Sequence, residues 1–167
     1  MITDTQIYCL DSNVLIQAWQ KYYSPVICPS YWDVLNSLGI QKRIFIPAVV
    51  FDEITRTDDD LSKWLLTCKI PILKINSGVA QCLKEIYATN PYHKFLVDNT
   101  KQRSLADPWV IASAMSEDAC VVTKEEKITA VNTDKIKIPN VCENMHVRCI
   151  NDFEFGLELK LRFSCQI

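Results

Sequence analysis

Residues 7–13 read Ile-Tyr-Cys-Leu-Asp-Ser-Asn, and this stretch decides the class of fold. The apolar run 7–10 has the length of a buried strand. Asp11, Ser12 and Asn13 are good helix N-caps, so a helix is expected to follow at once. A buried strand that leads directly into a helix is the first half of the unit from which parallel sheets are built.

The same alternation of short apolar strands and amphipathic helices continues along the chain. Helical spacing, caps or prolines predict helices over 14–23, 31–39, 47–54, 60–67, 79–87, 107–115 and 151–159. Apolar runs predict further strands over 44–46, 70–75, 119–122 and 146–150. Residues 124–137 are polar, and an irregular segment is expected there. The pattern predicts an α/β fold: a three-layer α/β/α sandwich with a central, mostly parallel sheet of four to five strands.

Length and composition are those of a globular protein. The chain has 167 residues, of which 49% are hydrophobic and 23% charged, so one domain spanning 1–167 is expected. No apolar run approaches the roughly 18 residues of a membrane helix. The first residues are polar and carry an acid, so we expect a cytoplasmic protein without a leader. The net charge of −2 lacks the basic surplus of many nucleic-acid binders.

The eight cysteines are interpreted mainly as reduced core thiols. Cys9, Cys68 and Cys120 lie in or beside apolar runs, where cysteine behaves as a small hydrophobe. One alternative is local: Cys142, His146 and Cys149 form a C-x3-H-x2-C pattern. A zinc site usually needs four ligands, and no fourth stands nearby, so this group has no assigned ligand.

Four acids follow strands or open helices of the predicted sheet. Asp11 comes directly after the first strand and Glu125 just after the fourth. Glu53 lies in the helix after the second strand, and Asp107 opens the helix that leads into the fourth. Each acid alone is also explained as a helix cap or a surface charge. Ligands bind beyond the carboxyl ends of parallel strands, however, and a doubly wound topology brings all four acids there.

Clustered carboxylates repel one another unless a cation neutralises them. Ligand sets made only of oxygen favour Mg²⁺ or Mn²⁺ over zinc. Such a site can activate water and stabilise the oxyanions of a phosphodiester displacement. The acids therefore point to a metal-dependent nuclease.

The stretches that carry these acids resemble the motifs of PIN domains, in the family's order. Leu10–Ile16 looks like the opening motif, and Val49–Ile54 resembles the second motif with its helical glutamate. Leu105–Ala114 resembles the third motif and Val121–Glu125 the fourth. The resemblance covers roughly residues 7–125 and implies a PIN-like fold.

By this resemblance, Asp11, Glu53 and Asp107 are ligands of Mg²⁺ or Mn²⁺, and Ser12 or Asn13 helps to orient Asp11. Together with the fourth acid they form the expected catalytic set.

The fourth position departs from the family, whose members usually carry aspartate there. Here it is Glu125, with Glu126 adjacent. Its longer side chain can reach a metal directly or through water, and which of the two glutamates completes the site is open. Thr123 and Glu126 are assigned supporting roles.

The resemblance implies an endoribonuclease that hydrolyses RNA phosphodiester bonds, as the toxin of a toxin–antitoxin pair. A cognate antitoxin protein and a homodimer are the expected assemblies. A catalytically weak or inactive PIN-like module that binds RNA or protein is the alternative, since Glu125 replaces aspartate. A nucleotide-binding α/β protein ranks lower, because the sequence has no Gly-rich phosphate loop.

Two tryptophans and five basic residues are further candidates for RNA contacts. Trp32 and Trp64 can stack bases, but their helical spacing with other apolar residues favours the core. Five basic residues can contact phosphate, although surface solvation is the default for each: Lys42, Arg43, Lys101, Arg103 and Lys124.

Overall fold

A five-stranded parallel sheet forms the centre of the molecule. The structure is a computed structural model that describes residues 6–98, 105–130 and 134–165. The strand order is β3-β2-β1-β4-β5, and each neighbouring pair is parallel. The bounds are β1 (Tyr8–Leu10), β2 (Ile44–Pro47), β3 (Ile72–Leu73), β4 (Cys120–Val122) and β5 (Cys149–Ile150). The predicted parallel sheet is confirmed.

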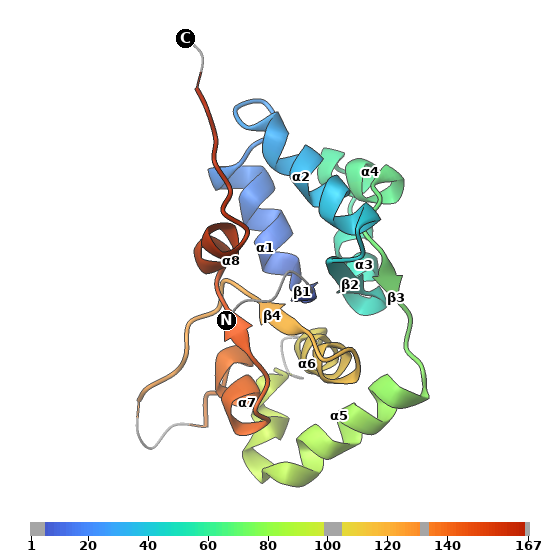
Figure 1. The fold of residues 1–167 in the computed structure, drawn as a ribbon. Coiled ribbons are helices and arrows are strands. Elements are labelled where there is room, and N and C mark those ends of the chain that lie inside the picture. Colours follow the sequence, from blue (N-terminus) through green and yellow to red (C-terminus); the bar gives the residue numbers. More distant parts are fainter. Residues whose placement is uncertain (1–5, 99–104, 131–133, 166–167) are drawn as a thin grey trace.

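Helices cover both faces of this sheet. On one face lie α1 to α4, with α8 beside α1, and on the other lie α5, α6 and α7 (Figure 1). Their bounds are α1 (Ser12–Gln17), α2 (Pro29–Ile40), α3 (Ala48–Thr55), α4 (Asp60–Thr67), α5 (Ser77–Thr89), α6 (Asp107–Ser116), α7 (Ile138–Asn144) and α8 (Asp152–Glu158). A π-helical turn, η1 (Ala18–Tyr22), extends α1, and a 3₁₀ segment, η2 (Pro91–Leu96), follows α5. The three-layer α/β/α sandwich is confirmed.

The core lies where α6 crosses the central strands. Every residue of β1, β2 and β4 is buried, as expected for a parallel sheet covered on both faces. Residues 110–114 of α6 are also buried, and Ala112 and Ala114 are small enough to let this helix lie close to β1 and β4.

The order of the strands fixes where a site can form. β1 pairs with β2 on one side and with β4 on the other, so the chain reverses its direction of winding at β1. Leu10 is in register with Val122, which places the carboxyl ends of β1 and β4 side by side. In such sheets the crevice at this switch point is the usual ligand site.

Three local features differ from the sequence-based expectations. The helix α7 was not predicted, because its seven residues are too few for a clear periodic pattern. The outer strands are shorter than predicted: β3 has two residues where 70–75 was expected, and β5 has two where 146–150 was expected. Before β5 the chain turns at His146, whose φ is +57°, and the amide N–H of Val147 donates to the Cys142 carbonyl.

Three tryptophans pack together between helices. The rings of Trp19 and Trp32 lie 4.7 Å apart between centroids, and Trp64 is 4.8 Å from Trp32. Trp32 is buried, and Trp64 packs against the core, so the interpretation of Trp32 and Trp64 as core residues is confirmed.

The core interpretation of the cysteines is confirmed for Cys9 and Cys120, whereas Cys68 is half-buried and Cys165 is exposed. All eight lie within the described residues as free thiols, and Cys9 and Cys120 are buried in the sheet. In the C-x3-H-x2-C group, Cys142 is fully buried whereas His146 is exposed. These two side chains therefore do not share one site for zinc.

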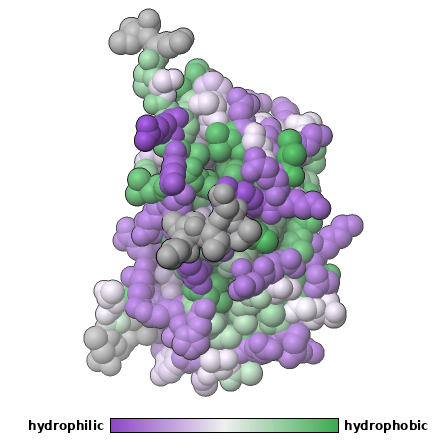
Figure 2. Space-filling view, in the orientation of Figure 1, coloured by the Kyte–Doolittle hydropathy of each residue, from purple (hydrophilic) through white to green (hydrophobic). Residues whose placement is uncertain are grey.

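The face of the molecule seen in Figure 2 has no separate polar and apolar regions. Figure 2 shows hydrophilic and hydrophobic residues interspersed over the visible face. No helix in the described ranges combines the length and apolarity that crossing a bilayer requires.

Candidate active site

Asp11 is a buried carboxylate at the switch point of the sheet. It follows β1 and is only 2% exposed. The Ser12 amide N–H donates to one carboxylate oxygen at 2.7 Å, and the Thr123 hydroxyl donates to the other at 2.8 Å. Burial raises the pKa of Asp11 from 3.8 to about 7; the Thr123 hydrogen bond opposes this, and the charges of Glu125 and Glu53 add to it. Asp11 therefore lies within electrostatic range of two further acids.

The end of β4 is tied to the end of β1 around this carboxylate. Thr123 is buried, and its hydroxyl also accepts the Glu125 amide N–H at 3.1 Å. The Asn13 side chain donates to the same hydroxyl at 3.4 Å and accepts the Lys124 amide N–H at 3.0 Å. Three residues expected to support the site thus surround Asp11, and their hydrogen bonds fix its orientation.

Glu125 has a partner on each carboxylate oxygen. Lys137 Nζ donates to Oε1 at 2.8 Å, and the Ile138 amide N–H donates to Oε2 at 2.9 Å. Ile138 is the first residue of α7, so the carboxylate also lies at the positive end of a helix, although this helix is short. Glu125 thereby joins the end of β4 to the start of α7.

Lys137 carries a positive charge into the group of acids. Its hydrogen bond to Glu125 raises the pKa of Lys137 above its usual value, and the charges of Asp107 and Asp11 add to the effect. The ammonium group therefore lies near three of the four predicted acids.

Asp107 and Glu53 reach the same edge from two other helices. Asp107 is the first residue of α6, whose C-terminal end leads into β4, and it is 9% exposed. Glu53 is exposed on α3, the helix that follows β2. Within the described residues, the structure brings no three acidic, histidine or cysteine side chains into an arrangement that holds a metal ion. The acids thus lie close enough for their charges to interact, but they do not form a closed set of metal ligands.

The residues at this edge nevertheless fit a divalent cation in donor type and in charge. Their donors are carboxylate oxygens, which suit Mg²⁺ or Mn²⁺. The raised pKa of Asp11 reflects a buried acid beside two others, and a cation bound there would offset both the burial and the repulsion. Asp11, Glu53 and Asp107 would hold the ion, whereas the Lys137 ammonium group beside Glu125 opposes the approach of a cation to that acid.

Comparison with known proteins gives the family. Residues 8–163 match a family described as "Domain of unknown function (DUF4411)". The chain belongs to this family. The description carries no activity, and no curated protein matches the chain.

Solved structures give this DUF4411 protein its fold relatives. It is similar to VapBC2 from Rickettsia felis bound to a promoter DNA fragment, with a TM-score of 0.58, 16% identity, and coverage of 87% of this chain and 98% of that one. FitAcB from Neisseria gonorrhoeae has a TM-score of 0.55 and 16% identity, with coverage of 88% of this chain and 99% of that one. DNA-bound VapBC from Salmonella typhimurium has a TM-score of 0.52 and 14% identity, with coverage of 87% of this chain and 98% of that one. At identities this low, the structural likeness shows the fold alone. It confirms the predicted PIN-like fold.

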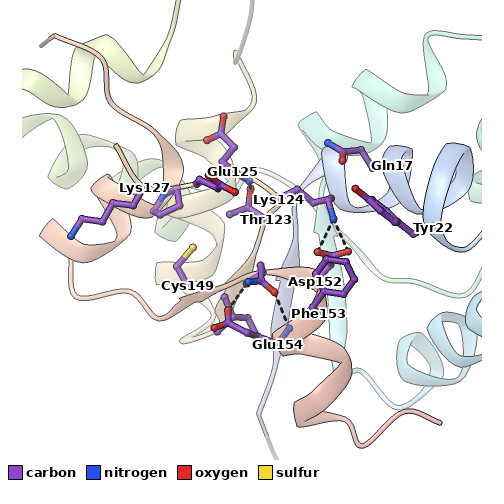
Figure 3. Close-up of a pocket in the computed structure, with 14 residues that line it drawn as sticks. Gln17, Tyr22, Thr123, Lys124, Glu125, Lys127, Cys149, Asp152, Phe153 and Glu154 are labelled. Carbon is purple, nitrogen blue, oxygen red and sulfur yellow. Dashed lines mark hydrogen bonds and ion pairs between the residues drawn. The ribbon is translucent and has the colours of Figure 1, made fainter. Parts of the chain in front are cut away.

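A pocket of about 540 Å³ adjoins the acids of the DUF4411 chain. It lies beyond the ends of β4 and β5, and Thr123 and Glu125 belong to its lining (Figure 3). Glu126, the remaining residue assigned a supporting role, is exposed and also lines this pocket. The pocket and the acidic site are therefore neighbours that share the end of β4.

Within the described residues, the candidates for phosphate contacts do not gather at this edge. Lys124 is held in an ion pair with Asp152 and its side chain is only 10% exposed, so the default of a solvated surface charge is wrong for this residue. Lys42 and Arg43 precede β2 at the opposite, amino edge of the sheet. Lys101 and Arg103 lie outside the described residues.

Sequence reasoning missed Lys137 and Asp152 as parts of this region. Pro139 indicates a helix start near Lys137, since proline is favoured in the first turn. Asn151 and Glu154 form a capping box that places Asp152 at the first turn of α8. In a parallel sheet, the helices between strands begin at the carboxyl edge. The two helix starts therefore indicated that Lys137 and Asp152 lie at this edge.

Proposed function

We propose that this protein is a divalent-metal-dependent endoribonuclease that hydrolyses RNA phosphodiester bonds and acts in the cytoplasm as the toxin of a toxin–antitoxin pair. The observation that carries the proposal is Asp11, a buried carboxylate beside other acids at the switch point of a PIN-like fold.

In this proposal each side chain has its own task. When bound, Mg²⁺ or Mn²⁺ supplies the Lewis acidity for hydrolysis of the phosphodiester. Asp11, Glu53 and Asp107 hold the ion from three different elements. The Ser12 amide and the Thr123 hydroxyl keep the Asp11 carboxylate in one orientation. Lys137 offsets the charge of Glu125, which lowers the repulsion that a phosphate group meets at this acidic edge.

The partner in this proposal is a small antitoxin protein that covers the acidic edge. The names of the similar structures support it, because VapBC and FitAcB are complexes named for two components. We also propose that the protein forms a homodimer, which sedimentation of the purified chain tests directly.

The test is cleavage of single-stranded RNA by the full chain in the presence of Mg²⁺ or Mn²⁺. Asp11→Asn and Asp107→Asn remove one negative charge each while keeping the side-chain shape. Both variants are expected to lose cleavage, because the remaining carboxylates bind the cation too weakly. Removal of the metal by EDTA is expected to have the same effect on the unmodified chain.

A matched control is Asp118→Asn. Asp118 is exposed and precedes β4 at the amino edge of the sheet, far from the acidic site in the topology. This variant is expected to cut RNA as fast as the unmodified chain. Equal cleavage by all three variants would contradict the proposal.

A second candidate function is a PIN-like module that binds RNA or protein without cutting. The ion pair between Glu125 and Lys137 favours it, because a lysine already neutralises one of the acids. Calorimetric titration with Mn²⁺ separates the two functions: saturable binding that Asp11→Asn removes supports the nuclease, and absence of binding supports the module.

A further inference from the structure

The pocket beside the acidic site is lined in part by an ion pair and two aromatic rings that contact one another. Lys124 lies between Tyr22 of η1 and Phe153 of α8, and its ammonium group reaches Asp152 (Figure 3). Nζ lies 2.8 and 2.9 Å from the two Asp152 oxygens, and the side chains are 10% and 3% exposed. Burial of a charged pair costs desolvation energy, so this pair contributes to the position of its neighbours rather than to strong net stability.

The same ammonium group contacts two aromatic rings. It lies 4.3 Å from the centroid of the Tyr22 ring and 4.8 Å from that of Phe153. Both distances are within the range of cation–π attraction. Lys124 therefore fixes the two rings relative to each other and to the end of β4.

The two rings remain accessible from the pocket. Tyr22 is 47% exposed and Phe153 is 52% exposed, and their centroids lie 5.8 Å apart with ring planes at 73°. A flat ligand can stack on one ring and meet the edge of the other, which is a favourable pair of aromatic geometries.

The charges that line the pocket decide which part of an RNA it accepts. Two ammonium groups and four carboxylates line it: Lys124, Lys127, Glu125, Glu126, Asp152 and Glu154. The excess of negative charge repels phosphate, while an uncharged base can stack there. The volume of about 540 Å³ is within the range of small-ligand sites.

We propose that Tyr22 and Phe153 form a stacking subsite for one unpaired nucleobase of single-stranded RNA, next to the phosphodiester at the acidic site. This rests on the proposed nuclease function, since Thr123 and Glu125 border both regions. Stacking accepts every base, because every base has a flat aromatic face, and it requires the base to be unpaired.

The experiment measures binding rather than cleavage. The full chain with Asp11→Asn, which keeps the RNA intact, is titrated into a short single-stranded RNA that contains 2-aminopurine. Base stacking quenches the fluorescence of this probe. Phe153→Ala and Tyr22→Ala are expected to remove the quenching and to weaken binding by about 5- to 150-fold, the range of one lost base stack.

Two sets of variants make the result specific. Leu157→Ala removes an exposed apolar side chain from the same helix outside the pocket and is expected to bind as before. Tyr22→Phe and Phe153→Tyr keep a ring and are expected to retain the quenching. Because the readout needs no catalysis, quenching can persist even when the unmodified chain fails to cut RNA.

The proposal is overturned by two outcomes. One is folded Tyr22→Ala and Phe153→Ala proteins that quench and bind like the parent chain. The other is that Phe153→Ala and Leu157→Ala both bind RNA like the parent chain but no longer bind a co-expressed protein partner. That second outcome would assign the surface to a protein instead.

Discussion

Asp11 makes folding of the metal-free protein unusually sensitive to pH. Its pKa is raised from 3.8 to about 7, chiefly by burial, so the folded chain keeps a proton that the unfolded chain has released. Stability is therefore expected to fall as the pH rises from about 4 to about 7. A shift of roughly three units corresponds to about 4 kcal/mol in total, of which about 3 kcal/mol falls between pH 5 and pH 8.

Asp11→Asn removes this titration and leaves a neutral amide in the same place. The amide has one oxygen for the two donors Ser12 N–H and Thr123 Oγ1, so the variant is expected to lose about 1 kcal/mol at about pH 5. At about pH 8 the same variant is expected to be more stable than the unmodified chain by about 2 kcal/mol.

Urea unfolding in the presence of EDTA, at several pH values, measures both curves. Asp118→Asn is the control, since Asp118 is exposed, and its curve is expected to follow that of the unmodified chain. Parallel pH dependences for Asp11→Asn and the unmodified chain would refute the reasoning, because they would mean that Asp11 ionises in the folded state without cost.

Three further changes test other contacts. Lys137→Met removes the cation from Glu125 and is expected to tighten Mn²⁺ binding about tenfold by calorimetry; unchanged or weaker binding would contradict this. Lys124→Met leaves Asp152 buried without its partner and is expected to cost about 3–5 kcal/mol in urea unfolding, with much of the loss restored in Lys124→Met/Asp152→Asn. If the double variant is as unstable as the single one, the charge is not the cause. Gly39→Ala places a Cβ atom 2.5 Å from the Lys69 carbonyl oxygen and 2.8 Å from Ile70 Cα, so a loss of about 1–3 kcal/mol is expected by thermal or urea unfolding, and a neutral effect would show that these backbone segments move apart freely.

The sequence predicted the sheet and the place of Asp11 because both depend on local patterns. The run 7–10 followed by Asp11 marks a buried strand and a helix start without reference to any distant residue. The carboxyl edge follows from this alternation, since parallel strands put all their carboxyl ends on one side.

The contacts that complete the site could not be predicted, because they join residues far apart in the chain. The Lys137–Glu125 pair depends on the position of α7, a helix too short to show periodicity. The Lys124–Asp152 pair depends on the packing of α8 against η1, which no spacing of residues reveals. Lys124 therefore looked like a surface charge in the sequence, and the structure made it a buried one.

Manganese soaked into crystals of the full chain tests the central claim most directly, because its anomalous scattering locates the ion. We expect a bound ion at the carboxyl edge, with an Asp11 oxygen among its ligands and with Glu53 and Asp107 drawn toward it. Crystals saturated with manganese that hold no ion there, with the three carboxylates still apart, would contradict it.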